Sequence, residues 1–130
     1  MSDVDAEATP FHRIGEQPAI RRLVDRFYDL METDPAYAEL RAMHAPDLAP
    51  MRGSLAGFLT GWLGGPRDWF EANRGVCMMS LHARVGVSAA TARQWREAMA
   101  RALADTGVDR GLAAQINAAF ARMSQNMQRD

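Results

Sequence analysis

The sequence predicts an all-α protein, and three observations support this prediction. Apolar residues recur at intervals of three and four positions along most of the chain, which is the spacing that aligns side chains on one face of an α-helix. Prolines and glycines divide these stretches at distances typical of helix ends. No stretch requires the two-residue alternation of a strand. We therefore expect helices throughout and no sheet.

The first predicted helix begins near Pro18, because proline fits the first turn of a helix. Its apolar face consists of Ile20, Leu23, Val24, Phe27, Leu30 and Met31. Tyr28 lies at the edge of that face and is expected to point inward. Asp34 can cap a second, shorter helix with Pro35 in its first turn. This second helix stops near His44, and its inward residues are Tyr37, Leu40 and Met43.

The third predicted helix follows Pro46 or Pro50 and ends at the glycine-rich run 64–66. It has a wide, partly aromatic stripe formed by Leu48, Met51, Leu55, Phe58, Leu59, Trp62 and Leu63. After this run the periodicity weakens. We expect only a short helical piece over residues 78–83, followed by a break at residues 85–87.

Two further helices complete the predicted fold. Ser88 can cap the first of them, whose inward residues are Ala92, Trp95, Met99, Ala102 and Leu103. Residues 105–107 close this helix, and Asp109 can cap the last one. The inward residues of the last helix are Leu112, Ile116, Ala119, Phe120, Met123 and Met127.

Length and composition limit the classes of function. The chain of 130 residues suffices for one core, and we expect a single domain over residues 10–130 after a polar, disordered tail over residues 1–9. Fifteen basic residues, all arginine, interleave with sixteen acidic ones, so no long-range field attracts nucleic acid or an anionic membrane. No stretch resembles a membrane span or a signal peptide. We therefore expect a cytoplasmic protein with no nucleic-acid or membrane partner.

Several common kinds of site are absent from the sequence. It contains no paired cysteine and histidine motif for zinc, no phosphate-binding glycine loop and no nucleophile elbow. The single cysteine, Cys77, excludes an intrachain disulfide and is interpreted as a small buried hydrophobe rather than a redox thiol. His12 lies in the polar leader, and we assign it no role.

His82 is the candidate metal ligand. It lies sixteen residues after Pro66 and thirteen before Trp95, where two helices can enclose a flat cofactor such as haem. Haem iron needs a neutral imidazole and an apolar slot. The carbonyl of Met78, four residues earlier, can accept the second ring N–H and fix the tautomer that coordinates metal. The alternative is a core histidine that is hydrogen-bonded only to the backbone.

Three further side chains can donate a hydrogen bond to a gas ligand at such a site. Tyr28, His44 and Trp95 each combine an apolar body with an O–H or N–H donor. Donors around bound dioxygen stabilise it and slow its release. The alternative is that Tyr28 and Trp95 are only core aromatics and that His44 is a solvated loop residue.

The order and spacing of these blocks resemble the group II truncated haemoglobins, small bacterial and plant globins with a two-over-two helical sandwich. The similarity covers about residues 14–103. It rests on Val24-Asp25-Arg26-Phe27-Tyr28, Phe58-Leu59 with Trp62-Leu63-Gly64-Gly65-Pro66, the interval to His82, and Arg93-Gln94-Trp95 with Met99.

This resemblance implies a haem b cofactor with His82 as the proximal iron ligand. It also implies that Tyr28 and Trp95 are distal hydrogen-bond donors, and that His44 lies above the haem. Met51 falls where vertebrate globins carry the distal histidine and where this group has a small residue. The remaining pocket-lining positions are matched by Leu55, Phe58 and Met99.

The chain departs from the family in the segment before His82. The family commonly has arginines there that help to bind the haem propionates, whereas residues 75–81 contain no basic residue. We therefore expect propionate contacts from Arg74, Arg84 or Trp69.

The resemblance implies that the protein binds or transports dioxygen and other diatomic ligands. Dense distal donors favour storage, sensing or redox handling over bulk delivery. Reaction with nitric oxide or peroxide is a further hypothesis, and it would need an electron-donor reductase as a partner. The alternative is a haem-free helical interaction module that retains the globin pattern, which the missing arginines favour.

Overall fold

The computed structural model describes residues 9–75 and 87–127. These residues form seven α-helices and one 3-10 helix, with no strand in the described ranges, as the sequence predicts. In chain order the elements are α2 (Pro10–Ile14), α3 (Glu16–Thr33), η1 (Pro35–Tyr37), α4 (Ala38–Ala42), α5 (Ala49–Trp62), α6 (Asp68–Ala72), α8 (Ala89–Asp105) and α9 (Arg110–Met127).

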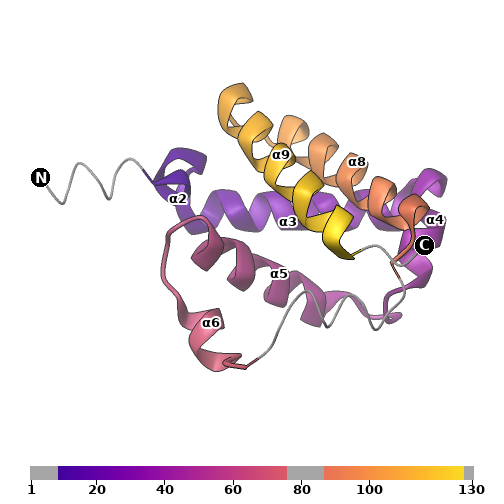
Figure 1. Ribbon diagram of the computed structural model, residues 1–130, viewed down its shortest axis with the longest axis horizontal. Coiled ribbons are helices and arrows are strands. Elements are labelled where there is room, and N and C mark those ends of the chain that lie inside the picture. The colour runs from indigo at the N-terminus through magenta and orange to yellow at the C-terminus, as the bar shows by residue number, and fades with distance from the viewer. Residues whose placement is uncertain (1–8, 76–86, 128–130) are drawn as a thin grey trace, which may run out of the picture.

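The long helices form two pairs that pack on each other. Helix α3 crosses the middle of the molecule, with α5 and α6 on one side and α8 and α9 on the other (Figure 1). Helix α3 packs against both α5 and α8, and α8 packs against α9. This arrangement is a two-over-two helical sandwich, and it confirms the predicted fold.

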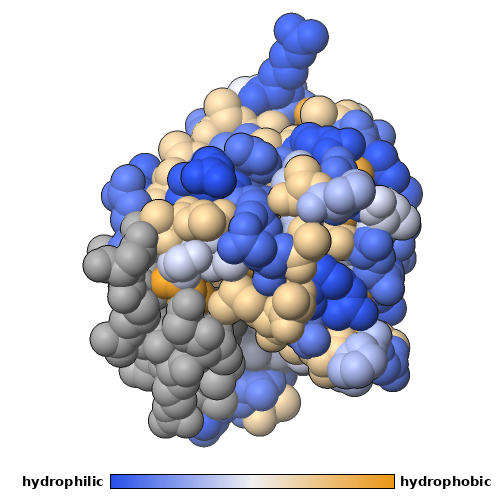
Figure 2. Space-filling model, turned by 90° about the vertical axis from the view of Figure 1, so that its right-hand side faces the viewer, coloured by the Kyte–Doolittle hydropathy of each residue, from blue (hydrophilic) through white to orange (hydrophobic). Residues whose placement is uncertain are grey.

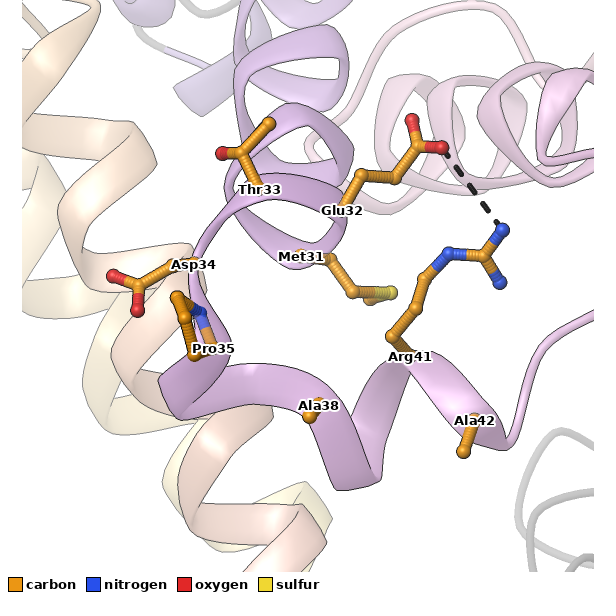
Figure 3. A pocket seen from close by; sticks show the side chains of 8 residues that line it. All are labelled: Met31, Glu32, Thr33, Asp34, Pro35, Ala38, Arg41 and Ala42. Atoms are coloured by element: carbon orange, nitrogen blue, oxygen red, sulfur yellow. Dashed lines mark ion pairs between the residues drawn. The ribbon is translucent and has the colours of Figure 1, made fainter.

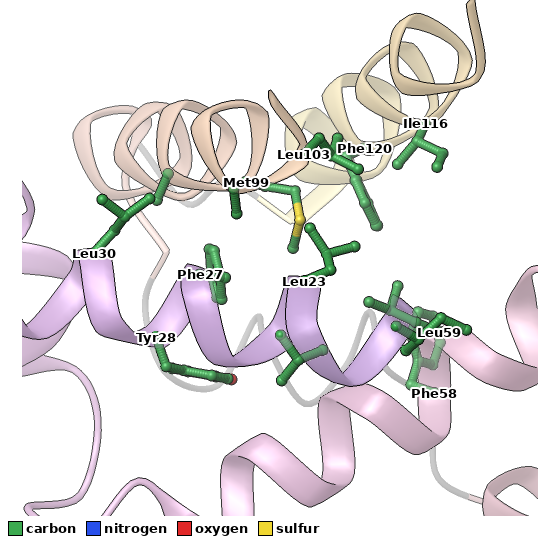
Figure 4. Packing of buried hydrophobic residues seen from close by; sticks show 14 of the residues in the cluster. Leu23, Phe27, Tyr28, Leu30, Phe58, Leu59, Met99, Leu103, Ile116 and Phe120 are labelled. Carbon is green, nitrogen blue, oxygen red and sulfur yellow. The ribbon is translucent and has the colours of Figure 1, made fainter. Parts of the chain in front are cut away.

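The core lies where α3 meets these other helices. Phe27, Leu23 and Met99 are each at most 1% exposed. Figure 4 shows Phe27 and Leu23 directed from α3 toward α8, and Met99 directed from α8 toward α3. Burying a side chain of this size stabilises the fold by about 1.5–3 kcal/mol relative to exposing it. The predicted inward faces of both helices are therefore correct here.

Local capping explains most of the helix boundaries. The Asp34 carboxylate accepts a hydrogen bond from the Ala36 amide at 2.9 Å, but the turn that follows is the 3-10 helix η1 rather than the predicted α-helix. The Ser88 hydroxyl accepts from the Thr91 amide at 3.1 Å in a capping box. Asp109 accepts from the Leu112 amide at 3.0 Å. All three predicted caps are thus confirmed.

Helix α2 is an element that we did not predict from the sequence. Residues 1–8 of the expected tail lie outside the described residues, and Thr9 caps α2 by accepting from the amide of His12. The Phe11 amide donates to the Leu63 carbonyl at 2.8 Å. A Cβ atom at Gly65 would lie 2.6 Å from the Phe11 ring. The glycine run therefore lets α2 close over the end of α5, in addition to ending that helix.

Helix α6 was also missed, because a five-residue helix has too little periodicity to recognise. Its aromatic residues pack on glycines of α5. A Cβ atom at Gly57 would lie 2.8 Å from the Trp69 side chain, and one at Gly61 would lie 2.5 Å from the Phe70 ring. These glycines are needed for the close approach of α6 to α5.

Two ion pairs join α3 and the turn after it to α8. Arg26 lies 2.8 Å from Asp105, and Arg101 lies 2.6 Å from Asp34. Both pairs are partly exposed, so each contributes little on its own, but they fix α8 at two separated points. Hydrophilic and mildly hydrophobic side chains mix over the face seen in Figure 2. No helix among the described residues is long and apolar enough to cross a membrane.

Candidate functional site

Tyr28 is the buried polar side chain from which the site can be built. It leaves α3 on the side of α5 (Figure 4) and is 2% exposed. Burial raises its pKa to about 12, and the nearby positive charge of Arg52 opposes this shift. Within the described part of the chain, no residue forms a hydrogen bond with the Tyr28 hydroxyl. The phenol is therefore a neutral donor that no described residue uses.

Trp95 and Tyr28 both contact the ring of Phe27. The Phe27 ring contacts the Tyr28 ring edge to face at 4.9 Å and the Trp95 ring at 5.2 Å. Trp95 is partly buried, and its other neighbour is Phe120 at 4.9 Å. Tyr28 and Trp95, which are 67 positions apart in the sequence, therefore share Phe27 as a ring neighbour.

The ring contacts continue from Phe120 to α5 and α6. Trp62 stacks on Phe120 at 5.0 Å and on Phe58 at 6.4 Å. Phe58 in turn meets Trp69 and Phe70 at 5.7 and 5.5 Å. We call this series the aromatic wall, and its members are Tyr28, Phe27, Trp95, Phe120, Trp62, Phe58, Trp69 and Phe70. Sequence analysis placed no functional weight on Phe27, Trp62, Phe70 or Phe120, although all but Phe70 fall on predicted inward faces.

His44 lies beside Tyr28, with the two rings edge to face at 6.1 Å. Its Nδ1 atom is 2.9 Å from the Leu40 carbonyl oxygen. A carbonyl only accepts, so Nδ1 carries the proton, and the Nε2 atom of the neutral ring is then an acceptor. The donor role that we expected of His44 would therefore require the doubly protonated ring.

The other predicted lining residues differ in exposure. Phe58 is buried and Met99 is fully enclosed in the core, whereas Leu55 and Trp69 are partly buried. Met51, in the first turns of α5, is 40% exposed. Four of these residues therefore belong to or pack against the core, and Met51 lies at the surface.

Three predicted site residues, His82, Met78 and Arg84, lie outside the described residues. The ligand role of His82 stays a prediction. Arg74, one of the candidate propionate partners, is exposed and pairs with Glu71 at 3.3 Å. Within the described ranges, no group of three or more His, Cys, Asp or Glu side chains could hold a metal ion.

Arg52 is a neighbour of Tyr28 that sequence analysis missed. Its guanidinium lies 5.7 Å from the centre of the Tyr28 ring. It also pairs with three carboxylates of α3, which belong to Asp25, Asp29 and Glu32. The spacing of these acids along one helix face is visible in the sequence, but the arginine that meets them comes from another helix.

Surface hollows elsewhere in the molecule do not coincide with the predicted site. One, of about 330 Å³, lies between the end of α3 and α4, and there Arg41 faces Glu32 at 3.9 Å (Figure 3). Another, of about 490 Å³, lies between α3 and α5 and is lined in part by Gly53 and Gly57. Neither hollow is lined by Tyr28 or Trp95.

Comparison with a family model and with solved structures points to the globins in both cases. The chain matches the model of the bacterial-like globins over residues 9–129. It is similar to the group II 2-on-2 haemoglobin of Agrobacterium tumefaciens, with 31% identity, a TM-score of 0.90, and coverage of 94% of this chain and 95% of that one. No curated protein matches the chain.

Two further solved structures are similar over nearly their whole length. The cold-adapted truncated haemoglobin of Pseudoalteromonas haloplanktis shares 28% identity at a TM-score of 0.87, with coverage of 94% of this chain and 98% of that one. The haemoglobin of Chloroflexus aurantiacus shares 30% identity at a TM-score of 0.84, with coverage of 95% and 100%.

Proposed function

The chain belongs to the bacterial-like globin family, and on this premise we propose that it binds haem b and holds a diatomic gas, foremost dioxygen. The group would be bound without covalent attachment, because a single cysteine cannot supply the C-x-x-C-H motif of attached haems. In this proposal the His82 imidazole would hold the iron.

The residues of the aromatic wall suit a flat apolar cofactor. Porphyrin is a large hydrophobe with charge only at its edge, so it favours apolar and aromatic surroundings. Trp62, Phe58 and Trp69 supply rings along α5 and α6, and Leu55 adds an aliphatic side chain to the same stripe of α5. Bound haem would supply reversible coordination of a diatomic gas.

The observation that carries the proposal is the Tyr28 hydroxyl. The ring of Tyr28 is buried, yet its hydroxyl forms no hydrogen bond with a described residue. Because no fully buried side-chain oxygen among the described residues lacks a partner, this hydroxyl is still accessible to a ligand. Its raised pKa keeps the proton in place at neutral pH. Such a group is suited to donate to a polar ligand held against the aromatic wall.

Trp95 would be the second donor to this ligand. The indole N–H can only donate, and the ring lies one phenyl group away from Tyr28. His44 would line the site beside Tyr28, because the two rings meet edge to face at 6.1 Å. Two donors around one ligand predict slow release, which suits storage, sensing or redox handling in the cytoplasm. Turnover of nitric oxide or peroxide would also require an electron-donor reductase.

The absorption spectrum of the purified chain tests the proposal. Protein expressed with adequate haem supply should show a Soret band, and exposure of the reduced form to dioxygen should shift this band reversibly. A folded, helical chain that takes up no haem would refute the proposal and favour the alternative of a haem-free interaction module.

The His82→Gly variant tests the proposed ligand. We expect it to lose haem on gel filtration, and added imidazole should restore binding because it replaces the missing ring. The matched control is His12→Gly, since His12 pairs with Glu16 at the surface and should not affect haem retention. Full retention of haem with an unchanged spectrum in His82→Gly would remove His82 from the ligand role.

A further inference from the structure

The side chain of Arg52 joins α5 to α3 directly over Tyr28. One amino group of the guanidinium donates to both the carbonyl and the carboxylate of Asp25, each at 3.1 Å. The other donates to Asp29 at 2.9 Å and to Glu32 at 3.2 Å. Asp25 lies three residues before Tyr28, and Asp29 and Glu32 lie one and four residues after it. The arginine is therefore held on both sides of the tyrosine.

The Arg52 bridge is less exposed and more fixed in orientation than an ordinary surface ion pair. The Arg52 side chain is only 19% exposed, whereas the three carboxylates are 42–55% exposed. A planar guanidinium with four hydrogen bonds has a defined orientation. Its position 5.7 Å from the centre of the Tyr28 ring is within the range of a cation–π contact. Arg52 thus fixes the phenol ring and places a positive charge beside it.

The bridge also lies near the start of α5. At the start of this helix the Asp47 carboxylate accepts from the Ala49 amide at 3.0 Å, but this bond does not reach α3, and Met51, adjacent to Arg52 in the sequence, is 40% exposed. Arg52 is the residue in this part of α5 that ties the helix to α3 by several hydrogen bonds. It therefore sets the distance between the first turns of α5 and Tyr28.

We infer that Arg52 is a positioning residue for the gas-binding site, which holds Tyr28 and the start of α5 in place and thereby slows release of the ligand. The inference rests on the proposed function. Loss of the bridge frees the Tyr28 ring and removes a positive charge that strengthens the phenol as a donor. Both effects weaken the hydrogen bond to the ligand, so both speed its release.

The test compares Arg52→Met with Arg101→Met. Arg101 is a matched control, because it lies 5.7 Å from the ring of the other tyrosine, Tyr37, and pairs with the carboxylate of Asp34. With haem bound, we expect dioxygen dissociation to be about fivefold faster in Arg52→Met and unchanged in Arg101→Met. Arg52→Lys should give an intermediate rate, because lysine keeps the charge but not the fork of donors.

A second measurement does not depend on haem. In protein with 13C-labelled tyrosine and the Tyr37→Phe background, ionisation of Tyr28 should move to higher pH in Arg52→Met, since the positive charge that lowers its pKa is removed. The same titration in Arg101→Met should not move. A wild-type chain without a Soret band would refute the proposed function. The titration would still show in that case whether Arg52 acts on Tyr28.

Unchanged dissociation in a folded, haem-loaded Arg52→Met protein would overturn the inference, as would an equal effect of Arg101→Met. If Arg52→Met does not fold, the double variant Asp29→Asn with Glu32→Gln loosens the bridge and retains the arginine. We expect dissociation about twofold faster in this protein. The wild-type rate in the double variant would equally overturn the inference.

Discussion

Tyr28 and Tyr37 are the two tyrosines of the chain. Their surroundings are similar, but their hydroxyls differ in hydrogen bonding. Each is 2% exposed, and each has an arginine guanidinium 5.7 Å from the centre of its ring. The Tyr37 hydroxyl accepts a hydrogen bond from Arg101 at 3.2 Å. The Tyr28 hydroxyl has no such partner in the described ranges, because Arg52 directs its donors to carboxylates.

This difference separates a structural tyrosine from a candidate binding residue. At Tyr37 the hydroxyl is part of the contact between α8 and η1, so its hydrogen bond stabilises the fold. At Tyr28 the same chemical group contributes its ring to the core and keeps its proton available. Burial alone therefore does not identify the functional tyrosine, whereas the hydrogen-bond partners do.

Exchange of each tyrosine for phenylalanine should separate ligand retention from stability. In Tyr28→Phe we expect dioxygen dissociation to be between about tenfold and a hundredfold faster, because one hydrogen bond to a polarised ligand is lost. The thermal midpoint should stay close to that of the wild type. In Tyr37→Phe the midpoint should fall by a few degrees, while dissociation is unchanged. Stopped-flow ligand replacement and thermal melts followed by circular dichroism measure the two effects.

Equal dissociation rates in the two phenylalanine variants would contradict the assignment of Tyr28 as a donor. It would mean that both tyrosines are core residues, which is the alternative that the aromatic spacing of the sequence also allows.

Alkaline titration should reveal the burial of Tyr28. An unfolded tyrosine ionises near pH 10, and the folded Tyr28 has a pKa of about 12. Between these values the unfolded chain has lost a proton that the folded chain retains, so unfolding releases protons. The free energy of unfolding should be insensitive to Tyr28 below pH 10. It should then fall by on the order of 2 kcal/mol between pH 10 and pH 12.

The composition simplifies this measurement, because no lysine titrates in the same pH range. The chain contains no lysine, since all fifteen of its basic residues are arginine, and arginine stays protonated in this range. In the Tyr37→Phe background, urea unfolding followed by circular dichroism should show the full alkaline decrease, and the further change Tyr28→Phe should abolish it. A decrease that persists without Tyr28 would show that another process destabilises the protein.

The sequence predicts those features that depend on local interactions. Asp34, Ser88 and Asp109 cap the helices where expected, because a cap is formed within a few residues along the chain. The inward position of Tyr28 also follows from helical periodicity. That Tyr28 and Trp95 both contact Phe27 does not follow from helical periodicity, because the two residues lie on different helices.

Other features depend on contacts between distant segments and could not be read from local patterns. The four hydrogen bonds of Arg52 exist because α5 crosses α3 at one particular position. The glycines at positions 57 and 61 look like weak points in a helix until Trp69 and Phe70 fill the space beside them. Likewise, the donor and acceptor roles of the His44 ring follow from its distance to one carbonyl.

The last and smallest expected effect concerns the coupling of Trp95 to Tyr28. Trp95→Phe should speed dioxygen dissociation by about tenfold or less, because it removes the indole N–H and keeps most of the ring contacts with Phe27 and Phe120. If both residues donate to one ligand, the double variant with Tyr28→Phe should deviate from additivity by about 0.5–1 kcal/mol. The double variant with Tyr37→Phe should be additive, since that tyrosine is committed to Arg101. Additivity in both double variants would mean that Tyr28 and Trp95 act on the ligand separately. The hypothesis that both donate to one ligand would then be wrong.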